Sequence, residues 1–198
     1  MKITGIQVVI MCKAPVAGRV KTRLMAAFSA QKAADLHAAM ATTVIHRAMR
    51  LFEDVVVAAD DPGHPFFTRF DLPVTAQGEG DLGDRMLSQV VRAFEDGGSM
   101  VMLLGTDSPH MPDAKLLEAS ALLQDHSVVI GPVEDGGYEL IGLSSPHPLF
   151  SGIAWSTDRV LAQTMALVRA QHLSCKLPET GFDIDNPEDL NRVNWPVY

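Results

Sequence analysis

A cluster of positive charge follows the first apolar run of the chain. Its four basic residues, Lys13, Arg19, Lys21 and Arg23, lie within eleven positions, and no acidic residue precedes Asp35. The formal net charge of the whole chain is −8, so this cluster is a local concentration of the kind that bound phosphate groups require. The alternative is a solvated basic stretch before a helix. Its place directly after a predicted strand favours phosphate binding.

A second candidate is the acidic residue in GTDSPHMP, residues 105–112. Asp107 follows the apolar run 100–104, which predicts that a buried strand delivers its carboxylate to the edge of a sheet. A carboxylate there can hold Mg²⁺ (or Mn²⁺), which takes hard oxygen ligands and bridges substrate phosphates. The alternative is an Asp that caps the following turn with its own side chain. His110, in the same loop, could touch substrate, but we expect it to be an exposed loop histidine.

Two further acidic residues stand two positions apart in FDIDNPEDL, residues 182–190. Asp183 and Asp185 point the same way if this segment is extended, and that geometry permits a shared metal ion. We expect Asp183 to be the second metal ligand. Asp185 is expected to be structural, because Asp185 or Asn186 could also cap a helix that starts at Pro187.

The segment EDGG lies between two predicted strands. Glu134 and Asp135 are candidate contacts for a substrate hydroxyl or for the metal ion. The pair Gly136-Gly137 allows a positive φ or a close approach of the backbone to a ligand. A plain hairpin turn explains the glycines equally well.

Three more residues are candidate substrate contacts. Gly18 lets the basic cluster turn sharply or approach a ligand, although the spacing is not that of a Walker A loop. Gly83 belongs to the glycine-rich segment 77–86, which could cover a nucleotide base or simply start a helix. Trp155 could bind the second substrate, unless Ser156 beside it only caps the next helix.

Apolar runs of strand length alternate with amphipathic segments of helix length along the chain. Strands are predicted at 6–12, 55–59, 74–77, 100–104, 128–133, 138–143 and 173–177. Helices are predicted after Ser29 and at 84–95, 112–124, 157–170 and from Pro187. This order predicts a three-layer α/β/α sandwich around a mixed, mostly parallel sheet, with ligands at the carboxyl ends of the strands. The direction of 138–143 stays open. The length of 198 residues fits one domain, 1–198.

Composition excludes several classes of protein. The acidic net charge argues against a general nucleic-acid-binding surface. No segment approaches the roughly 20 apolar residues of a membrane span, and the apolar run at 6–12 is too short for a signal peptide. Cys12 and Cys175 both fall in predicted strands, so we expect both to be buried and reduced, as suits the cytoplasm. Nothing in the sequence sets the oligomeric state.

The segments that carry these residues also resemble a known family. The matching segments, in chain order, are KAPVAGRVKTRL, GDLGDRM, GTDSPHMP, GPVEDGGYELIGL, AWSTDRV and DIDNPEDL. Together they resemble the uncharacterised bacterial transferases with a GT-A-like fold, within the nucleotide-diphospho-sugar transferase superfamily. Each segment alone is weak evidence, whereas six in order are specific for the family and much less specific for its reaction.

This resemblance implies a nucleotide bound across the carboxyl ends of the early strands. It implies that Asp107 coordinates the metal ion and that Asp183 supplies a second ligand. It also implies that Gly136-Gly137 approaches the second substrate. By the same resemblance, phosphates contact Lys13, Lys21 and Arg23.

The chain also departs from the superfamily in two respects. It lacks the fuller glycine-rich opening of the sugar-nucleotide pyrophosphorylases. It also lacks the D-x-D motif of many glycosyltransferases, because residue 105 is Gly.

The expected activity is nucleotidyl transfer that depends on Mg²⁺, from a nucleoside triphosphate to a phosphorylated small molecule. Lys21, Arg23 and Asp107 would be the catalytic residues, because positioning and charge neutralisation dominate phosphoryl chemistry. The first alternative is glycosyl transfer from a nucleotide-diphospho-sugar, with Glu134 or Asp135 as the base. The second alternative is a nucleotide-binding protein without catalysis.

Overall fold

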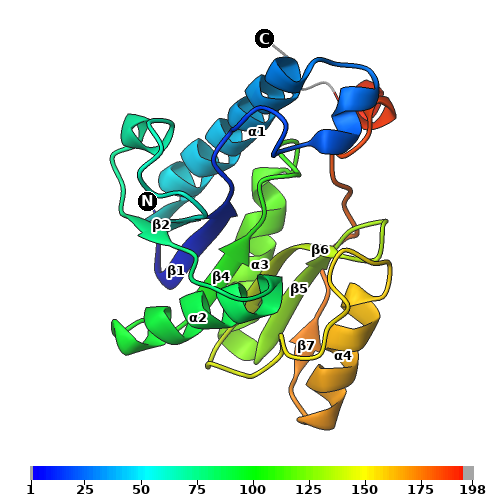
Figure 1. Ribbon diagram of the computed structural model, residues 1–198. Helices are drawn as coiled ribbons and strands as arrows, with labels where there is room; N and C mark the ends of the chain where they lie inside the picture. The colour runs from blue at the N-terminus through cyan, green and yellow to red at the C-terminus, as the bar shows by residue number, and fades with distance from the viewer. Residues whose placement is uncertain (1, 194–198) are drawn as a thin grey trace.

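The computed structural model describes residues 2–193, in which seven strands form one mixed sheet (Figure 1). The strand order is β3-β2-β1-β4-β6-β5-β7. The strands are β1 (Ile3–Cys12), β2 (Phe52–Ala59), β3 (Val74–Ala76), β4 (Val101–Leu104), β5 (Val128–Pro132), β6 (Tyr138–Leu143) and β7 (Cys175–Lys176). All neighbouring pairs are parallel except those of β6, which runs antiparallel to both β4 and β5. That settles the direction that the sequence left open.

Four α-helices cover the two faces of the sheet. They are α1 (Ala30–Leu51), α2 (Leu82–Glu95), α3 (Asp113–Asp125) and α4 (Val160–Ala170). Three 3₁₀ helices complete the described elements: η1 (Thr22–Ala26), η2 (Phe67–Arg69) and η3 (Pro187–Arg192). The alternation of β1 decides the layers, because Val8 and Ile10 pack with α1 and α3 whereas Val9 packs with α2 and α4. The predicted three-layer α/β/α fold is thereby confirmed.

Caps fix the starts of the two helices that flank the site. The Ser29 hydroxyl accepts a hydrogen bond from the Lys32 amide at 3.2 Å and begins α1, as expected. Asp81 and Asp84 form a capping box, so α2 begins at Leu82 and not at Asp84. The position of Asp84 is therefore N3 of the helix.

Two other expectations need correction. Helix α4 begins at Val160, later than predicted, because Ser156 has a positive φ of 62° and cannot serve as an ordinary helix cap. Cys175 is half-buried at the edge strand β7, whereas Cys12 is fully buried in β1. Both thiols are free.

The mixed topology gathers several loops at one edge of the sheet. The parallel strands β1, β3 and β4 end there, and antiparallel β6 begins there. The segment before η3 joins them, because the Ile184 amide donates to the carbonyl of Asp107 at 2.9 Å. Within the described residues, no helix is both long and apolar enough to cross a membrane.

Candidate active site

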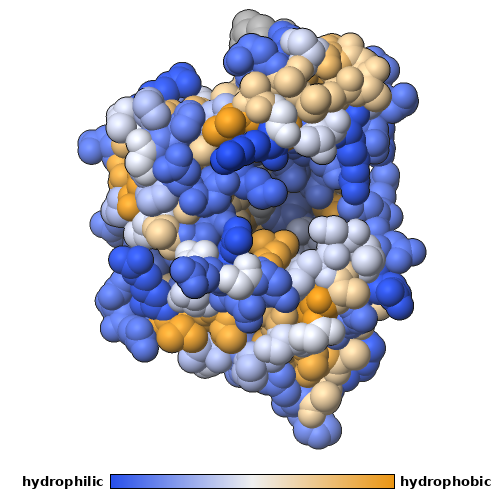
Figure 2. Space-filling view, in the orientation of Figure 1, coloured by the Kyte–Doolittle hydropathy of each residue, from blue (hydrophilic) through white to orange (hydrophobic). Residues whose placement is uncertain are grey.

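A cavity of about 880 Å³ opens at this edge of the sheet. Figure 2 shows it as a hollow in a largely hydrophilic face of the molecule. Its wall includes Lys13, Lys21 and Arg23 from the first loop, and Asp107 and Asp183 from two others. The structure therefore brings together the residues predicted to bind phosphates and the residues predicted to bind a metal ion.

Lys21 forms the centre of this wall. Its Nζ lies 2.8 Å from Asp107 Oδ1 and 2.8 Å from Asp185 Oδ1, and it donates to the Ile184 carbonyl at 2.7 Å. The side chain is only 5% exposed. Burial alone would lower the pKa of Lys21, but Asp107 and Asp185 outweigh burial and raise it. The ammonium group therefore stays charged at neutral pH.

Asp185 is a partner of the basic loop. Besides Lys21, it binds Arg23, whose Nη1 lies 2.8 Å from Asp185 Oδ2. The Asp185 amide itself donates to Asp189 in η3 at 3.1 Å. Asp185 thus has a structural role: it binds Lys21 and Arg23, which precede it by 164 and 162 residues.

Asp183 occupies a more buried position than Asp107. Its Oδ1 accepts a 2.6 Å hydrogen bond from the hydroxyl of Ser108. Burial, followed by the nearby charge of Asp107, raises the pKa of Asp183 to about 7. A bound cation would offset both effects by stabilising the charged carboxylates, so this pair of acids is suited to one.

The residues present fit a magnesium ion in a specific sense. Within residues 2–193, no group of three or more His, Cys, Asp and Glu side chains is arranged to hold a metal ion by itself. Mg²⁺ is commonly held by one or two carboxylates, with water and substrate phosphates as the remaining ligands. Asp107 and Asp183 satisfy that requirement, and both line the cavity.

The basic loop is held in place by contacts that the sequence did not reveal. The Ala14 amide donates to Asp60 Oδ1 at 2.6 Å, and His37 Nε2 lies 2.9 Å from the carbonyl of Lys13. His37 lines the cavity from α1 and is only 4% exposed. Burial lowers its pKa, so it is a neutral ring. Gly18, with φ 80°, turns the loop but does not line the cavity.

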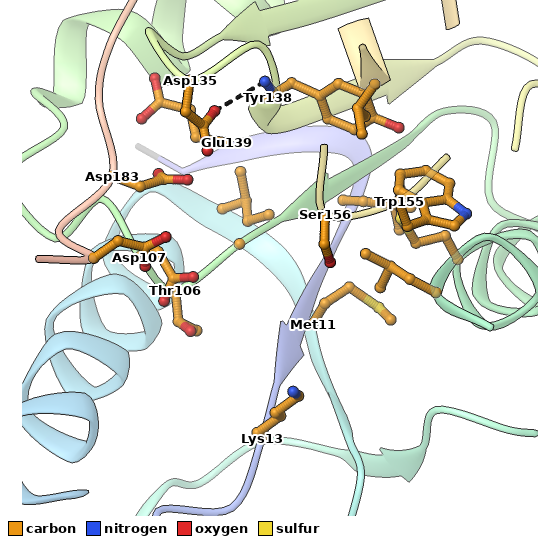
Figure 3. Close-up of a pocket in the computed structure, with 18 of the residues that line it drawn as sticks. Met11, Lys13, Thr106, Asp107, Asp135, Tyr138, Glu139, Trp155, Ser156 and Asp183 are labelled. Carbon is orange, nitrogen blue, oxygen red and sulfur yellow. Dashed lines mark hydrogen bonds between the residues drawn. The ribbon is translucent and has the colours of Figure 1, made fainter. Parts of the chain in front are cut away.

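The EDGG segment divides into a part that faces the cavity and a part that does not. Asp135 and Gly137 line the cavity, and Asp135 Oδ1 accepts the Gly137 amide at 2.9 Å (Figure 3). A Cβ built on Gly136 would overlap the carbonyl oxygen of Asp158, so the close approach of Gly136 is to the protein's own backbone. Glu134 points to Arg192, with its Oε1 2.8 Å from Nη2.

Trp155 lies on the side of the cavity opposite Asp107 and Asp183 (Figure 3). Its ring meets Tyr138 edge-on, with centroids 6.4 Å apart. A Cβ on Gly83 would overlap the carbonyl of Phe150 and lie 2.7 Å from Trp155 Nε1. Gly83 does not line the cavity, and its close approach is to the protein's own Phe150 and Trp155. It lets α2 pack closely against the tryptophan.

An aromatic stack braces the acidic segment from behind. The ring of His110 lies against the ring of Phe182, with centroids 4.1 Å apart. The guanidinium carbon of Arg192 also lies over the Phe182 ring, 3.7 Å from its centroid. His110 is half-buried, not exposed as expected, because this ring and its own loop cover it. Burial, then the charges of Arg47 and Arg192, lowers its pKa.

A buried ion pair lies behind the same wall. Glu139 in β6 lines the cavity and accepts a hydrogen bond from Lys115 of α3, with both side chains almost fully buried. Glu139, Lys115 and His37 were not among the residues predicted from the sequence to form the site. The one available signal was a charged or polar residue at an otherwise apolar position of a strand or helix.

Two comparisons with known proteins identify what the chain is similar to. A family model described as "Uncharacterized protein conserved in bacteria (DUF2064)" matches residues 47–157. A solved structure of a candidate nucleotide-diphospho-sugar transferase from Desulfovibrio desulfuricans G20 is 31% identical, with a TM-score of 0.88. That match covers 96% of this chain and 86% of the other. No curated protein matches the chain.

More distant structures share the fold. One is CMP:2-keto-3-deoxy-manno-octonic acid synthetase complexed with CTP, at 13% identity and a TM-score of 0.59, covering 94% of this chain and 95% of that one. Another is 4-diphosphocytidyl-2C-methyl-D-erythritol synthase from Anaerococcus prevotii, at 11% identity and a TM-score of 0.59, covering 96% and 97%. At these identities the likeness concerns the fold alone.

Proposed function

The chain belongs to the bacterial DUF2064 family, and from that premise and the geometry of its cavity we propose that it is a magnesium-dependent nucleotidyltransferase. A transferase that uses a nucleotide is supported by the 31% identical relative, a candidate nucleotide-diphospho-sugar transferase. The finer assignment, transfer from a nucleoside triphosphate, rests on the site itself.

One observation carries this proposal. The cations of the first loop and the acids Asp107 and Asp183 line the same cavity, at the edge where parallel strands end. Anionic phosphates need the cations, and a magnesium ion that bridges phosphates needs the acids. A triphosphate uses this dense positive charge more fully than a diphosphate does.

The reaction requires little covalent participation by the protein. An oxygen of the acceptor forms a bond to the α-phosphorus, the bond from that phosphorus to the oxygen that bridges it to the β-phosphorus breaks, and pyrophosphate leaves with the electrons of that bond. Any proton on the attacking oxygen is released to water. When bound to Asp107 and Asp183, Mg²⁺ supplies charge neutralisation to the phosphates. Lys13 and Arg19 line the same cavity and would orient the phosphate chain.

The test is a panel of nucleoside triphosphates. The protein is incubated with each triphosphate, Mg²⁺ and pooled small-molecule acceptors, phosphorylated and not, and released pyrophosphate is measured. CTP belongs in the panel because a structure of the same fold was solved with CTP. Pyrophosphate release that requires both Mg²⁺ and Asp107 would support the proposal. Absence of release, together with absence of any thermal stabilisation by nucleotides, would leave a non-catalytic or unrelated role.

Glycosyl transfer is the second candidate, and one observation favours it. Trp155 faces the acids across the cavity, where an aromatic ring could pack against a sugar. The donor would then be a nucleotide-diphospho-sugar. Asp135 would be the candidate base, since Glu134 is turned toward Arg192. A parallel panel of nucleotide-sugars, followed by release of nucleoside diphosphate, distinguishes the two reactions.

A further inference from the structure

Lys21 Nζ lies among three of the protein's own acceptors in this structure. An ammonium group carries three N–H donors. Asp107, Asp185 and the carbonyl of Ile184 lie 2.8, 2.8 and 2.7 Å from Lys21 Nζ. The residue expected to hold phosphate thus donates to Ile184 and Asp185 and forms an ion pair with Asp107.

The backbone of Lys21 is also held in an uncommon conformation. Its φ of 46° and ψ of 44° place it in the left-handed region, just before η1. A residue with a Cβ adopts this region at a cost of about 1–2 kcal/mol in general, and such strain persists where the surroundings enforce it. Here the surroundings are two carboxylates and a carbonyl that hold a side chain with 5% exposure.

The occupied carboxylate is the one assigned to the metal ion. Asp107 Oδ1 contacts Lys21 Nζ, whereas the Asp107 side chain as a whole is 43% exposed and faces the cavity. An ammonium ion and a divalent cation repel each other strongly at the separations that one carboxylate imposes. The two cations therefore compete for Asp107.

We propose that Lys21 and a divalent metal ion exchange at Asp107. Without a nucleotide, Lys21 neutralises the carboxylate and keeps its affinity for the metal low. When a nucleotide arrives with its metal ion, the metal takes Asp107, and the ammonium moves to the phosphate oxygens that the nucleotide brings. This exchange rests on the proposed nucleotide-dependent function. It adds that Lys21 occupies Asp107 before the nucleotide and metal ion bind, and leaves it when they do.

Asp185 can keep the basic loop in place while Lys21 leaves Asp107. It binds Arg23 Nη1 at 2.8 Å through Oδ2, separately from the Oδ1 contact with Lys21. The basic loop thus stays tied to the acidic segment by Arg23 when Lys21 leaves. If Lys21 were only a structural link, its ammonium group would stay at Asp107 when a metal ion binds.

The test measures Mn²⁺ binding to the nucleotide-free protein by electron paramagnetic resonance. Lys21→Gln should bind Mn²⁺ roughly tenfold more tightly than the wild type, a coupling of ordinary size between two ligands of one site. The matched control is Lys176→Gln in β7, which removes the same charge from an exposed position and should leave Mn²⁺ affinity unchanged. Asp107→Asn in the Lys21→Gln background should abolish the gain. Unchanged or weaker binding by Lys21→Gln would overturn the exchange.

A second measurement uses the unaltered protein, in case the variant does not fold. Acetylation of lysines by an N-hydroxysuccinimide ester should spare the buried Lys21 in the free protein, and should reach it as Mn²⁺ alone is raised to high concentration. Continued protection at saturating Mn²⁺ would contradict the exchange while leaving the proposed function intact. If Mn²⁺ binds neither the free protein nor the protein with a nucleoside triphosphate, both proposals fail.

Discussion

The hydroxyl of Ser108 donates a 2.6 Å hydrogen bond to Asp183 Oδ1 and so joins the loop after β4 to the acidic segment near the C-terminus. The two residues are 75 positions apart in sequence. Because Asp107 and Asp183 would share one metal ion, this bond fixes the spacing of the two ligands.

Replacing Ser108 by Ala should therefore affect stability and metal binding together. A hydrogen bond to a charged or buried acceptor contributes about 1–3 kcal/mol, so we expect a loss of that size in urea unfolding. Stabilisation by nucleotide with Mg²⁺ should fall as well. Ser99→Ala, which removes an exposed bond to the Gly5 carbonyl, is the control and should change neither value appreciably. Equal effects of the two substitutions would show that the Ser108 bond has no special role.

Asp107→Asn tests the metal assignment directly. The amide keeps the shape of the side chain but loses the charge that a magnesium ion needs. Nucleotides should then give the same thermal shift with and without Mg²⁺, whereas Mg²⁺ should increase the shift of the wild type. Asp125→Asn, at the far end of α3, is the matched control. A full Mg²⁺ response in Asp107→Asn would remove this residue from the metal site.

The pKa of Asp183 predicts a characteristic dependence of stability on pH. Burial raises this pKa to about 7, above the unfolded value of about 4. Between those values the folded protein binds the extra proton, so the contribution of Asp183 to the free energy of unfolding falls as pH rises. It falls by at most roughly 1.4 kcal/mol per pH unit and is constant above the folded pKa.

Asp183→Asn should remove this dependence. Without Mg²⁺, the variant should gain stability relative to the wild type as pH is raised from 5 to 8, measured by urea unfolding at each pH. Saturating Mg²⁺ should reduce the difference, because the metal ion compensates the charge that burial disfavours. A difference between variant and wild type that does not change with pH would contradict the environment described for Asp183.

Much of this site follows from the order of apolar runs along the chain. The runs 6–12 and 100–104 became β1 and β4, and parallel strands place the residues after them at one edge. Lys21 and Asp107 could therefore be expected to meet. The helix after Ser29 was equally predictable, because a local hydrogen bond to Lys32 defines its start.

The remaining features depend on contacts between distant residues. Nothing local in KTR shows that Lys21 Nζ lies against Asp107, Asp185 and Ile184, since Asp185 lies 164 residues later. The glycine at 83 looked like part of a flexible loop, but its neighbours are Phe150 and Trp155. His37 was hidden because its position on α1 is that of a core residue. Such roles are set by packing, which periodicity does not encode.

Gly136 provides a last prediction about the architecture of the cavity wall. It has a φ of 87°, and a Cβ there would overlap the Asp158 carbonyl, so two separate penalties apply to Gly136→Ala. Gly97 has a φ of 93° but no atom within 4 Å of the position that a Cβ would take, so Gly97→Ala carries the conformational penalty alone.

We expect Gly97→Ala to lower the free energy of unfolding by about 1–2 kcal/mol, because of the left-handed backbone. Gly136→Ala should cost more, because steric overlap adds about 1–3 kcal/mol and displaces the start of α4. Urea unfolding of both variants measures the difference. Equal losses of stability in the two variants would mean that the segment before α4 moves away from the new Cβ at little cost. Gly136 would then not hold the cavity wall that contains Trp155 in place.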